Sequence, residues 1–365
     1  MIVRESIDEL LNAPEGEHYQ IDVHRSIYAE SGHDFSGDIC PGIKIDDLFC
    51  EAIETFRSLW SSYSGNKRIA NLSLEQLLRD CGAINDDGIT YAALILFGNK
   101  NTLRKHLPHA EIVFEYRSKE SAGPAAHRED FQIGFFCSFN KIWDLINLRN
   151  DNQHYQKGFA VLPVPTFNER VIRESILNAA CHRDYQLGGS IFVRQYNNRI
   201  VIESPGGFPH GITAENILYR QSPRNKLIAD IFQLCGLVER AGQGMNMIYE
   251  TSISEAKPFP DFTGSDAYFV KLTLVGKIID VRMLQLIKKL DDEILSAMTT
   301  DDYLLLASVF KEKNIADISP LRFEHLLELG IVRQTELGIE LINGDLTLAI
   351  NGTPVNEKNG IIKLS

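Results

Sequence analysis

The stretch ERVIRESILNAACHRDY, residues 169–185, decides the fold. Its apolar residues recur at helical spacing, so the stretch predicts an amphipathic helix. Glu174 and Asn178 lie four positions apart and therefore project from the same face of that helix, one turn apart. The amide oxygen of Asn178 can ligate Mg²⁺, and the carboxylate of Glu174 can orient or deprotonate an attacking water. An ordinary solvated helix face explains the same spacing, and this segment alone favours that simpler interpretation.

The next segment, SIFVRQYNNRIVIESPGGFP at residues 190–209, predicts a β-hairpin. Two stretches of alternating apolar residues flank Asn197-Asn198, which is a turn signal. The second strand runs into Ser204-Pro205-Gly206-Gly207, where glycines let the backbone approach a flat ligand. A plain Pro-Gly turn is the competing interpretation.

A third segment, SPRNKLIADIFQLCGLVERAGQGMNMIYE at residues 222–250, predicts a helix that ends at Gly236 and a second helix from Met245 to Glu250. Gly242 and Gly244 come just before the second helix. Free backbone N–H groups and the positive end of a helix dipole form an anion site there. A lone pair of glycines also occurs in simple interhelical turns, so the strength of the signal lies in the order of all three segments.

That order resembles the divergent GHKL-type ATP-binding family, found in RecG-related ATP-dependent DNA helicases and transcriptional regulators. The residues that carry the resemblance are RESILNAACHRDY, IVIESPGGFPHGIT, SPRNKLIADIFQLCGLVERAGQGM and PDF, with ITYAALILFGN before them. The resemblance implies a fold of the α+β class, with a Bergerat-type α/β sandwich that binds ATP and Mg²⁺.

The resemblance also assigns roles to residues. It implies Glu174 as the catalytic, water-orienting base and Asn178 as the Mg²⁺ ligand. Ser204, Gly206 and Gly207 stand where the superfamily has its adenine-reading DxGxG motif, and Gly242 and Gly244 stand where its phosphate-cradling glycines lie. The 208–225 loop corresponds to the ATP lid and makes Arg224 available for a phosphate.

Two positions depart from the superfamily pattern. Ser204 replaces the aspartate that accepts a hydrogen bond from the adenine amino group, and a hydroxyl accepts a weaker bond than a carboxylate. Cys181 lies where some members carry an acidic residue. Both departures leave open a degenerate site that does not hydrolyse ATP.

The rest of the sequence predicts further helices, strands and domains around this segment. Helices are expected at 46–60 and 131–148, a strand at 110–116, and a helix after the N-cap Ser73. After Gly276, helices around 281–297, 301–313 and 319–329 precede short strands at 330–333 and 338–342, which is the order of a winged helix-turn-helix. The expected units are an N-terminal helical and irregular segment (1–65), a mixed α/β scaffold (66–164), the GHKL-like ATP-binding domain (165–275) and a winged-helix-like domain (276–365).

The family usually carries an AlbA/Schlafen-type N-terminal domain implicated in nucleic-acid binding. The residues before the matching body leave little room for it, so we expect the chain to lack most of that domain, as a natural short form or a truncated one. A Walker A motif is absent from the sequence, and we therefore expect no helicase activity.

Composition limits the classes of function. The net charge is −12, and the last 90 residues hold 10 Lys and Arg against 14 Asp and Glu, so a protein partner competes with double-stranded DNA as the binding target. The six cysteines are scattered without CxxC spacing, which argues against a disulfide framework or zinc site. The sequence lacks a secretory signal and a long apolar run, which predicts a cytoplasmic protein without membrane association.

Three other groups of residues have simpler explanations than catalysis. His182 and Asp184 follow Asn178, but close neighbours on a helix do not face each other, so we expect His182 to position the helix end or the lid. His106 and His109 are expected in a surface loop rather than at a metal. The aromatic run from Phe131 to Phe139 is expected to pack in the core rather than to stack on bases.

The sequence therefore predicts an ATP-binding regulatory protein, a transcriptional regulator whose nucleotide state modulates binding of DNA or of a protein partner. A scaffold with a degenerate nucleotide site and a slow Mg²⁺-dependent ATPase remain the alternatives. The resemblance also implies a homodimer as one assembly.

Overall fold

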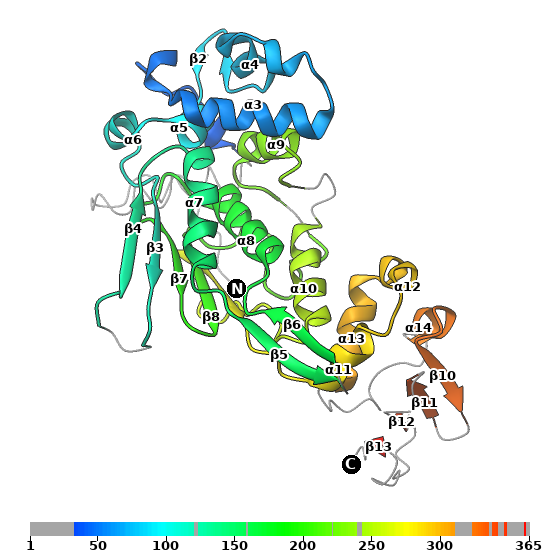
Figure 1. The fold of residues 1–365 in the computed structure, drawn as a ribbon. Helices are drawn as coiled ribbons and strands as arrows, with labels where there is room; N and C mark the ends of the chain where they lie inside the picture. Colours follow the sequence, from blue (N-terminus) through cyan, green and yellow to red (C-terminus); the bar gives the residue numbers. More distant parts are fainter. Residues whose placement is uncertain are drawn as a thin grey trace, which may run out of the picture.

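A computed structural model describes residues 33–119, 123–157, 160–220, 222–238, 243–310, 323–335, 338–341, 347–348 and 361–362. Residues 1–32 of the expected 1–65 segment lie outside these residues, as does Gly242. The expected mixed α+β class is confirmed, with helices gathered around a five-stranded sheet (Figure 1).

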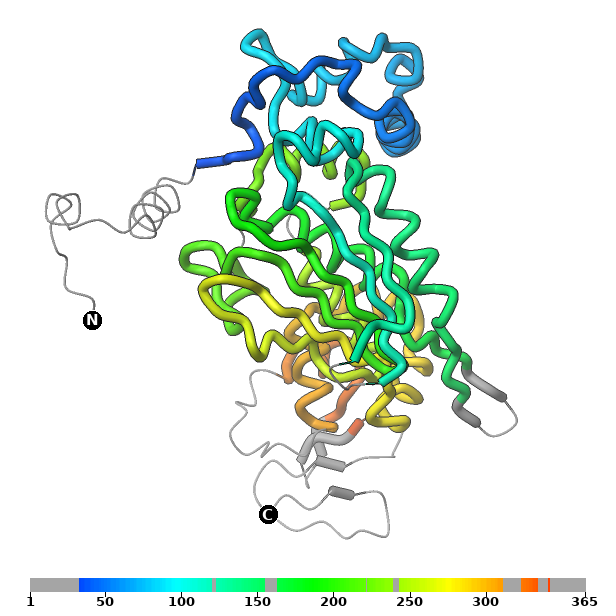
Figure 2. Tube along the Cα trace, turned by 90° about the vertical axis from the view of Figure 1, so that its left-hand side faces the viewer, coloured from blue at the N-terminus to red at the C-terminus, as the bar shows by residue number. Residues whose placement is uncertain are grey.

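Short helices form one end of the molecule (Figures 1 and 2). They include α3 (Cys50–Ser64), α4 (Leu74–Asp80), α5 (Tyr91–Phe97) and α6 (Lys100–His106), together with the 3-10 turns η1 (Phe35–Gly37), η2 (Ile45–Asp47) and η3 (Ile69–Asn71) and the two-residue strands β1 (Ile84–Asn85) and β2 (Gly88–Ile89). The predicted N-cap Ser73 is confirmed, because its side chain accepts a hydrogen bond from the backbone N–H of Gln76.

The helix expected from Asp46 begins four residues later, at Cys50. Asp46 belongs to the 3-10 turn η2, and Leu48 and Phe49 are extended. Phe49 donates its backbone N–H to the carbonyl of Phe97 at 2.6 Å. This long-range pairing holds the segment extended and delays the start of the helix.

The central sheet has the order β4-β3-β7-β8-β9. Its strands are β3 (Ile112–Tyr116), β4 (His127–Phe131), β7 (Ile191–Gln195), β8 (Arg199–Pro205) and β9 (Phe269–Val275). Strands β3 and β7 are parallel, and the other neighbours are antiparallel. The predicted hairpin at Asn197-Asn198 is the β7–β8 pair, and the sheet joins strands from the expected 66–164 and 165–275 segments.

Helices α7 (Phe135–Asn147) and α8 (Glu169–His182) lie against one face of the sheet (Figure 1). The helix expected at 131–148 starts later because Phe131 is in β4, paired with Ile112. The expected core role of the aromatic run is confirmed, since Phe131, Phe135, Phe136 and Phe139 are buried. Phe135 and Phe136 also contact Phe232 of α9 (Lys226–Leu234), with ring centroids 4.8 and 5.9 Å apart.

Helix α10 (Gly244–Ser254) lies beside α8 and leads towards a second hydrophobic cluster. That cluster contains residues of α11 (Val281–Ile287), α13 (Thr300–Phe310) and α14 (Glu324–Glu328). The helix expected at 281–297 is divided into α11 and α12 (Asp292–Ala297), because Asp291 caps the new helix by accepting from Ile294 N–H.

Short strands complete this end of the chain. Strands β10 (Val332–Thr335) and β11 (Gly338–Leu341) are the expected antiparallel pair, and β12 (Thr347–Leu348) and β13 (Ile361–Ile362) extend their sheet. A separate hairpin, β5 (Asn152–Lys157) with β6 (Ala160–Pro165), precedes α8.

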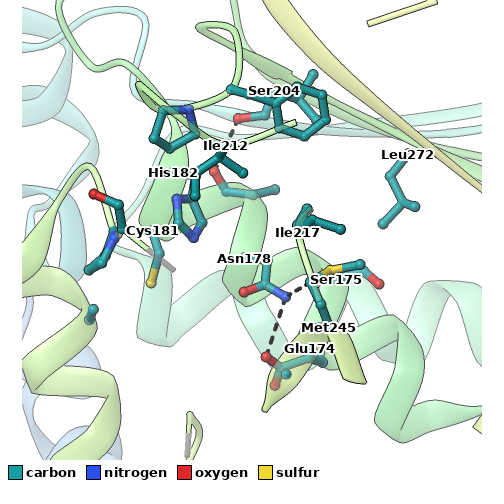
Figure 3. Close-up of a pocket in the computed structure, with 18 of the residues that line it drawn as sticks. Glu174, Ser175, Asn178, Cys181, His182, Ser204, Ile212, Ile217, Met245 and Leu272 are labelled. Carbon is teal, nitrogen blue, oxygen red and sulfur yellow. Dashed lines mark hydrogen bonds between the residues drawn. The ribbon is translucent and has the colours of Figure 1, made fainter. Parts of the chain in front are cut away.

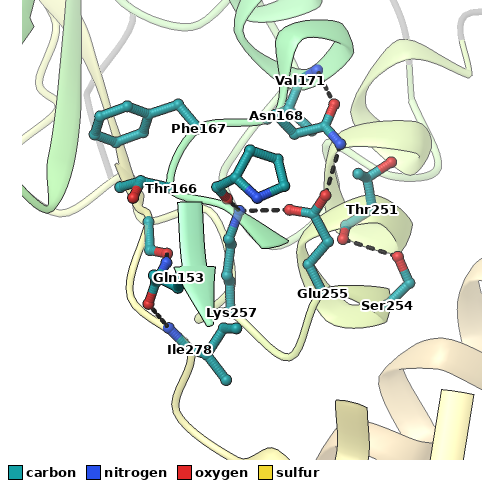
Figure 4. A network of polar contacts seen from close by, with 12 residues as sticks. Gln153, Thr166, Phe167, Asn168, Val171, Thr251, Ser254, Glu255, Lys257 and Ile278 are labelled. Carbon is teal, nitrogen blue, oxygen red and sulfur yellow. Dashed lines mark hydrogen bonds and ion pairs between the residues drawn. The ribbon is translucent and has the colours of Figure 1, made fainter. Parts of the chain in front are cut away.

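A buried polar network lies where the two clusters meet (Figure 4). Lys257 donates to the carbonyl of Pro165 at 2.7 Å and pairs with Glu255, whose other oxygen accepts from Asn168, the N-cap of α8. Burial lowers the pKa of Lys257, and the neighbouring Glu255 opposes that effect. The network ties the start of α8 to the end of α10.

Within the described residues, each helix is too short or too polar to cross a lipid bilayer.

Replacing Asn225 tests how α8 and α9 are joined. Its buried side chain donates to the carbonyls of Cys181 at 2.9 Å and Arg183 at 2.7 Å. Asn225→Ala should lower the free energy of unfolding by about 1–3 kcal/mol, because buried carbonyls lose their donor. Urea denaturation measures the loss, with the exposed Asn101→Ala as control. An unchanged urea midpoint in Asn225→Ala would contradict the assigned junction.

Candidate functional site

A cavity of about 300 Å³ opens between α8, β8, the 208–223 segment, α9 and the start of α10 (Figure 3). Its volume lies at the lower end of ligand pockets. Apolar residues and glycines form most of its walls, and nine polar or charged side chains complete them. The polar and charged lining side chains are Glu174, Ser175, Asn178, His182, Ser204, Arg220, Ser222, Asp230 and Gln233.

Glu174 and Asn178 reach this cavity from the same face of α8, as their spacing predicts. The Asn178 amide Nδ2 donates to Glu174 Oε1 at 3.3 Å and approaches Met245 Sδ at 3.9 Å. With Nδ2 directed to these atoms, the amide oxygen of Asn178 is on the opposite side of the same group. Glu174 is 8% exposed, so its carboxylate is largely removed from water.

Gly244 brings α10 into contact with Glu174. A Cβ at Gly244 would lie 1.8 Å from Glu174 Oε1 and 2.7 Å from its carboxyl carbon. Only a glycine therefore permits this approach while the carboxylate keeps its position. The structure thus brings three of the predicted site residues, Glu174, Asn178 and Gly244, to one cavity.

The glycine turn after β8 lies on another wall. Ser204 and Gly206 line the cavity, and Gly206 has a positive φ of 94° that suits glycine. Ser204 is buried, and its hydroxyl donates to the carbonyl of Ala179 at 3.0 Å. Gly207 is absent from the lining, and a Cβ there would lie 2.7 Å from the carbonyl oxygen of Asp266. Gly207 therefore permits close packing on the neighbouring loop.

The 208–223 segment supplies an apolar cover. Phe208, Pro209, Ile212, Ile217 and Pro223 line the cavity from this segment. The sequence resemblance predicted an ATP lid in this segment. The apolar lining arises because particular apolar side chains of the segment turn towards the cavity. That orientation could not be derived from the composition of the loop.

Arg224 points to backbone and carboxylate groups instead of lining the cavity. It donates to the carbonyls of His182 at 3.1 Å and Gly207 at 2.8 Å, and pairs with Asp184 at 3.4 Å. The arginine that lines the cavity is Arg220, which sequence reasoning missed. Its exposed side chain lies four positions earlier in the same loop, and local sequence offers no signal to separate the two.

His182 lines the cavity as well, and the sequence reasoning did not place it there. Burial, and then the charge of Arg224, lower the pKa of His182 to about 4, so the imidazole is neutral near pH 7. Its Nδ1 is buried and has no hydrogen-bond partner among the described residues. Burial also raises the pKa of the Cys181 thiol far above its usual range, which keeps that sulfur protonated.

The other histidine pair lies elsewhere. His106 is at the end of α6, and His109 contacts the carbonyl of Tyr185 at 2.7 Å. In the described part of the chain, His, Cys, Asp and Glu side chains form no group of three that could hold a metal ion.

Comparisons with known proteins match two segments of the chain. Residues 188–274 match the family model described as "Putative ATP-dependent DNA helicase recG C-terminal". Residues 25–113 match a domain of unknown function, DUF8451. The first match spans β7, β8, the 208–223 segment, α9 and α10, and so covers most of the cavity but not α8. A search of curated proteins gives no match.

A solved structure shares the fold. The DIP2311 protein from Corynebacterium diphtheriae superposes with a TM-score of 0.65 at 23% sequence identity. The match covers 87% of this chain and 66% of the DIP2311 chain. The present chain thus spans slightly less than two thirds of the length of the DIP2311 chain.

The contact between Gly244 and Glu174 can be measured as an energetic coupling. Gly244→Ala should destabilise the protein, because the new methyl group must push the buried carboxylate away from Asn178. In a Glu174→Ala background the same change should be nearly neutral, which corresponds to a coupling energy of about 0.5–3 kcal/mol. Chemical denaturation of the four proteins gives this value. Equal effects of Gly244→Ala in both backgrounds would show that the two residues do not touch.

The lowered pKa of His182 predicts a pH dependence of stability. The unfolded histidine, with its ordinary pKa near 6.5, binds a proton more readily than the folded one at about 4. Stability should therefore be complete above about pH 6.5 and decrease as the pH falls towards 4. His182→Gln should reduce the slope over this window, measured as unfolding free energy against pH. An unchanged slope in His182→Gln would mean that His182 titrates normally.

Proposed function

We propose that the chain binds ATP with Mg²⁺ in this cavity and acts as a regulatory protein, with a Bergerat-type fold around the site. The observation that carries the proposal is the meeting of Asn178, Gly244 and Ser204 at one cavity, inside and beside the segment that matches the RecG C-terminal family model. These residues come from three separate elements, α8, α10 and β8. The fold, and not closeness in the sequence, brings them together.

The amide of Asn178 fits a role in holding magnesium. Its nitrogen is engaged with Glu174 and Met245, which directs a hard oxygen away from those partners. Magnesium prefers oxygen ligands, keeps several waters and is commonly held by one or two protein groups plus phosphates. A single amide oxygen is therefore sufficient when phosphates supply further ligands.

Glu174 explains why a cation should accompany the nucleotide. Its carboxylate lies beside the first residue of α10, where a phosphate would otherwise interact favourably with the helix dipole. A phosphate placed next to a buried carboxylate is repelled unless a positive charge lies between them. Arg220 in the lid supplies a further positive charge at the cavity and is our candidate for a phosphate contact in place of Arg224.

The regulatory part of the proposal rests on contacts from the cavity walls to the C-terminal helices. Tyr219 of the lid donates to Asp301 at 2.9 Å, and Asn246 of α10 donates to Thr300 at 2.9 Å. Thr300 also bonds to Glu250. We propose that nucleotide occupancy alters the lid and α10, and thereby α13 and a winged-helix-like C-terminal domain that contacts DNA or a protein partner.

Calorimetric titration with Mg²⁺ and ATP tests the site. Wild type should bind, and Asn178→Ala should bind at least about tenfold more weakly, because a polar ligand to a charged group is lost. Asn101→Ala, on the exposed surface of α6, is the matched control and should bind as wild type does. Absence of binding by wild type, or equal binding by Asn178→Ala, contradicts the assigned site.

The two alternatives separate in further assays. A slow ATPase releases phosphate in a reaction that Glu174→Ala abolishes, and no release above background excludes it. A scaffold with a degenerate site binds no ATP in the titration. A salt-sensitive mobility shift with duplex DNA then distinguishes DNA binding from contact with a protein partner.

A further inference from the structure

His182 is a polar group in the cavity that the proposed magnesium and phosphate contacts do not use. It follows Asn178 by one helical turn on α8 and lines the cavity together with Ser204 (Figure 3). Its Nδ1 is shielded from solvent and has no hydrogen-bond partner among the described residues. The half-buried ring therefore presents its Nε2 edge as the side that a ligand can reach.

The buried Nδ1 of His182 carries a cost that a ligand at Nε2 does not remove, but the Nε2 edge can still form a new hydrogen bond. A buried polar group without a partner loses its hydrogen bond to water and gains none from the protein. The neutral form predominates near pH 7, because burial and Arg224 both disfavour the protonated ring. A neutral imidazole carries one N–H donor and one acceptor, and the tautomer with hydrogen on Nε2 offers a donor to the cavity.

Ser204 offers the complementary group. Its hydroxyl hydrogen is directed to the carbonyl of Ala179 at 3.0 Å, so the lone pairs of its oxygen are left to accept. The cavity thus holds an acceptor from β8 and a neutral donor from α8. Ile202 and Leu272 from the sheet and Ile212 and Ile217 from the lid form apolar walls suited to a flat ring.

This pairing matches one edge of adenine. The exocyclic amino group of adenine donates a hydrogen bond, and the adjacent ring nitrogen N1 accepts one. Guanine has the reverse order at the same positions, a carbonyl acceptor followed by an N–H donor. A site with Ser204 as acceptor disfavours guanine, because the guanine carbonyl oxygen lies opposite the Ser204 oxygen and both are acceptors. The other tautomer of His182 relieves the clash at N1 but not the one at Ser204.

We propose that His182 is the second base-reading residue of the site, donating from Nε2 to N1 of adenine while Ser204 accepts from the adenine amino group. The inference rests on the proposed function, because it takes ATP as the ligand. It gives the site a way to select adenine without the carboxylate that Ser204 replaces.

The test pairs single-atom changes in the nucleotide with changes in the protein. In 1-deaza-ATP a C–H replaces N1, and in purine riboside triphosphate a hydrogen replaces the amino group. Wild type should bind each analogue about 3- to 10-fold more weakly than ATP, the size expected for one hydrogen bond between neutral groups. GTP should bind more weakly still.

The protein variants assign each loss to a residue. In His182→Phe the ratio between ATP and 1-deaza-ATP should fall to about one, while the penalty for the missing amino group persists. Ser204→Ala should show the opposite pattern. His182→Gln keeps an N–H donor and should restore part of the discrimination against 1-deaza-ATP, which a merely structural role of the imidazole would not do.

The outcomes separate failure of this inference from failure of the proposed function. If wild type binds neither ATP nor its analogues, the proposed function fails. If wild type binds ATP but His182→Phe weakens ATP and 1-deaza-ATP by the same factor, the site stands and His182 does not read N1. Circular dichroism and the urea midpoint of His182→Phe show whether it is folded. If it is not, the His182→Gln ratio decides, and a ratio of one overturns the inference.

Discussion

The carbonyl groups at the end of α8 organise the site. The last turn of a helix leaves backbone carbonyls without intrahelical donors, and buried carbonyls require partners. Here Asn225 donates to Cys181 and Arg183, and Arg224 donates to His182. Ser204 adds a second donor to Ala179, whose carbonyl already accepts from the backbone N–H of Arg183. Ser204 of β8 lines the cavity, whereas Arg224 and Asn225 lie just before α9 and outside the cavity lining. The helix end is thereby bonded both to β8 and to the start of α9.

This arrangement explains the position of Arg224. A guanidinium has several donors in a fixed plane, and hydrogen bonds to two carbonyls plus an ion pair with Asp184 use that geometry well. Releasing it to contact a phosphate would leave the His182 and Gly207 carbonyls without this donor. Arg220, in contrast, lines the cavity itself. The backbone carbonyls that accept from Arg224 thus keep it out of the cavity, and Arg220 is the arginine that faces the cavity.

The parts predictable from sequence are those that depend on local patterns. Periodicity and turn residues identified the helix carrying Glu174 and Asn178, the hairpin at Asn197-Asn198 and the helix after Gly244. The parts that could not be predicted depend on pairing between distant segments. Phe131 joins β4 because Ile112 lies opposite it, and Leu48 and Phe49 stay extended because Phe97 and Gly98 pair with them. Local propensity contains no information on such partners.

The same limit applies to the site. The spacing of Glu174 and Asn178 placed them on one face, but the contact with Gly244 crosses 70 residues and required α10 to pack on α8. His182 was expected to position the helix end or the lid, whereas its ring lines the cavity. Its proposed role as a ligand contact follows from its place on the cavity wall together with Ser204, which only three-dimensional proximity makes visible.

Two routes connect the cavity to the C-terminal helices, and their strengths differ. The bond from Tyr219 to Asp301 joins exposed side chains, and a hydrogen bond in such a place contributes little because water competes for both groups. Helix α10 is different, since Ile253 near its end is fully buried in the second cluster and its polar residues Asn246 and Glu250 both bond to Thr300. Its first residue meanwhile touches Glu174. Because packed interiors transmit displacement rather than absorb it, a ligand that moves Glu174 is felt at α13 mainly through α10, with the lid contact as the weaker route.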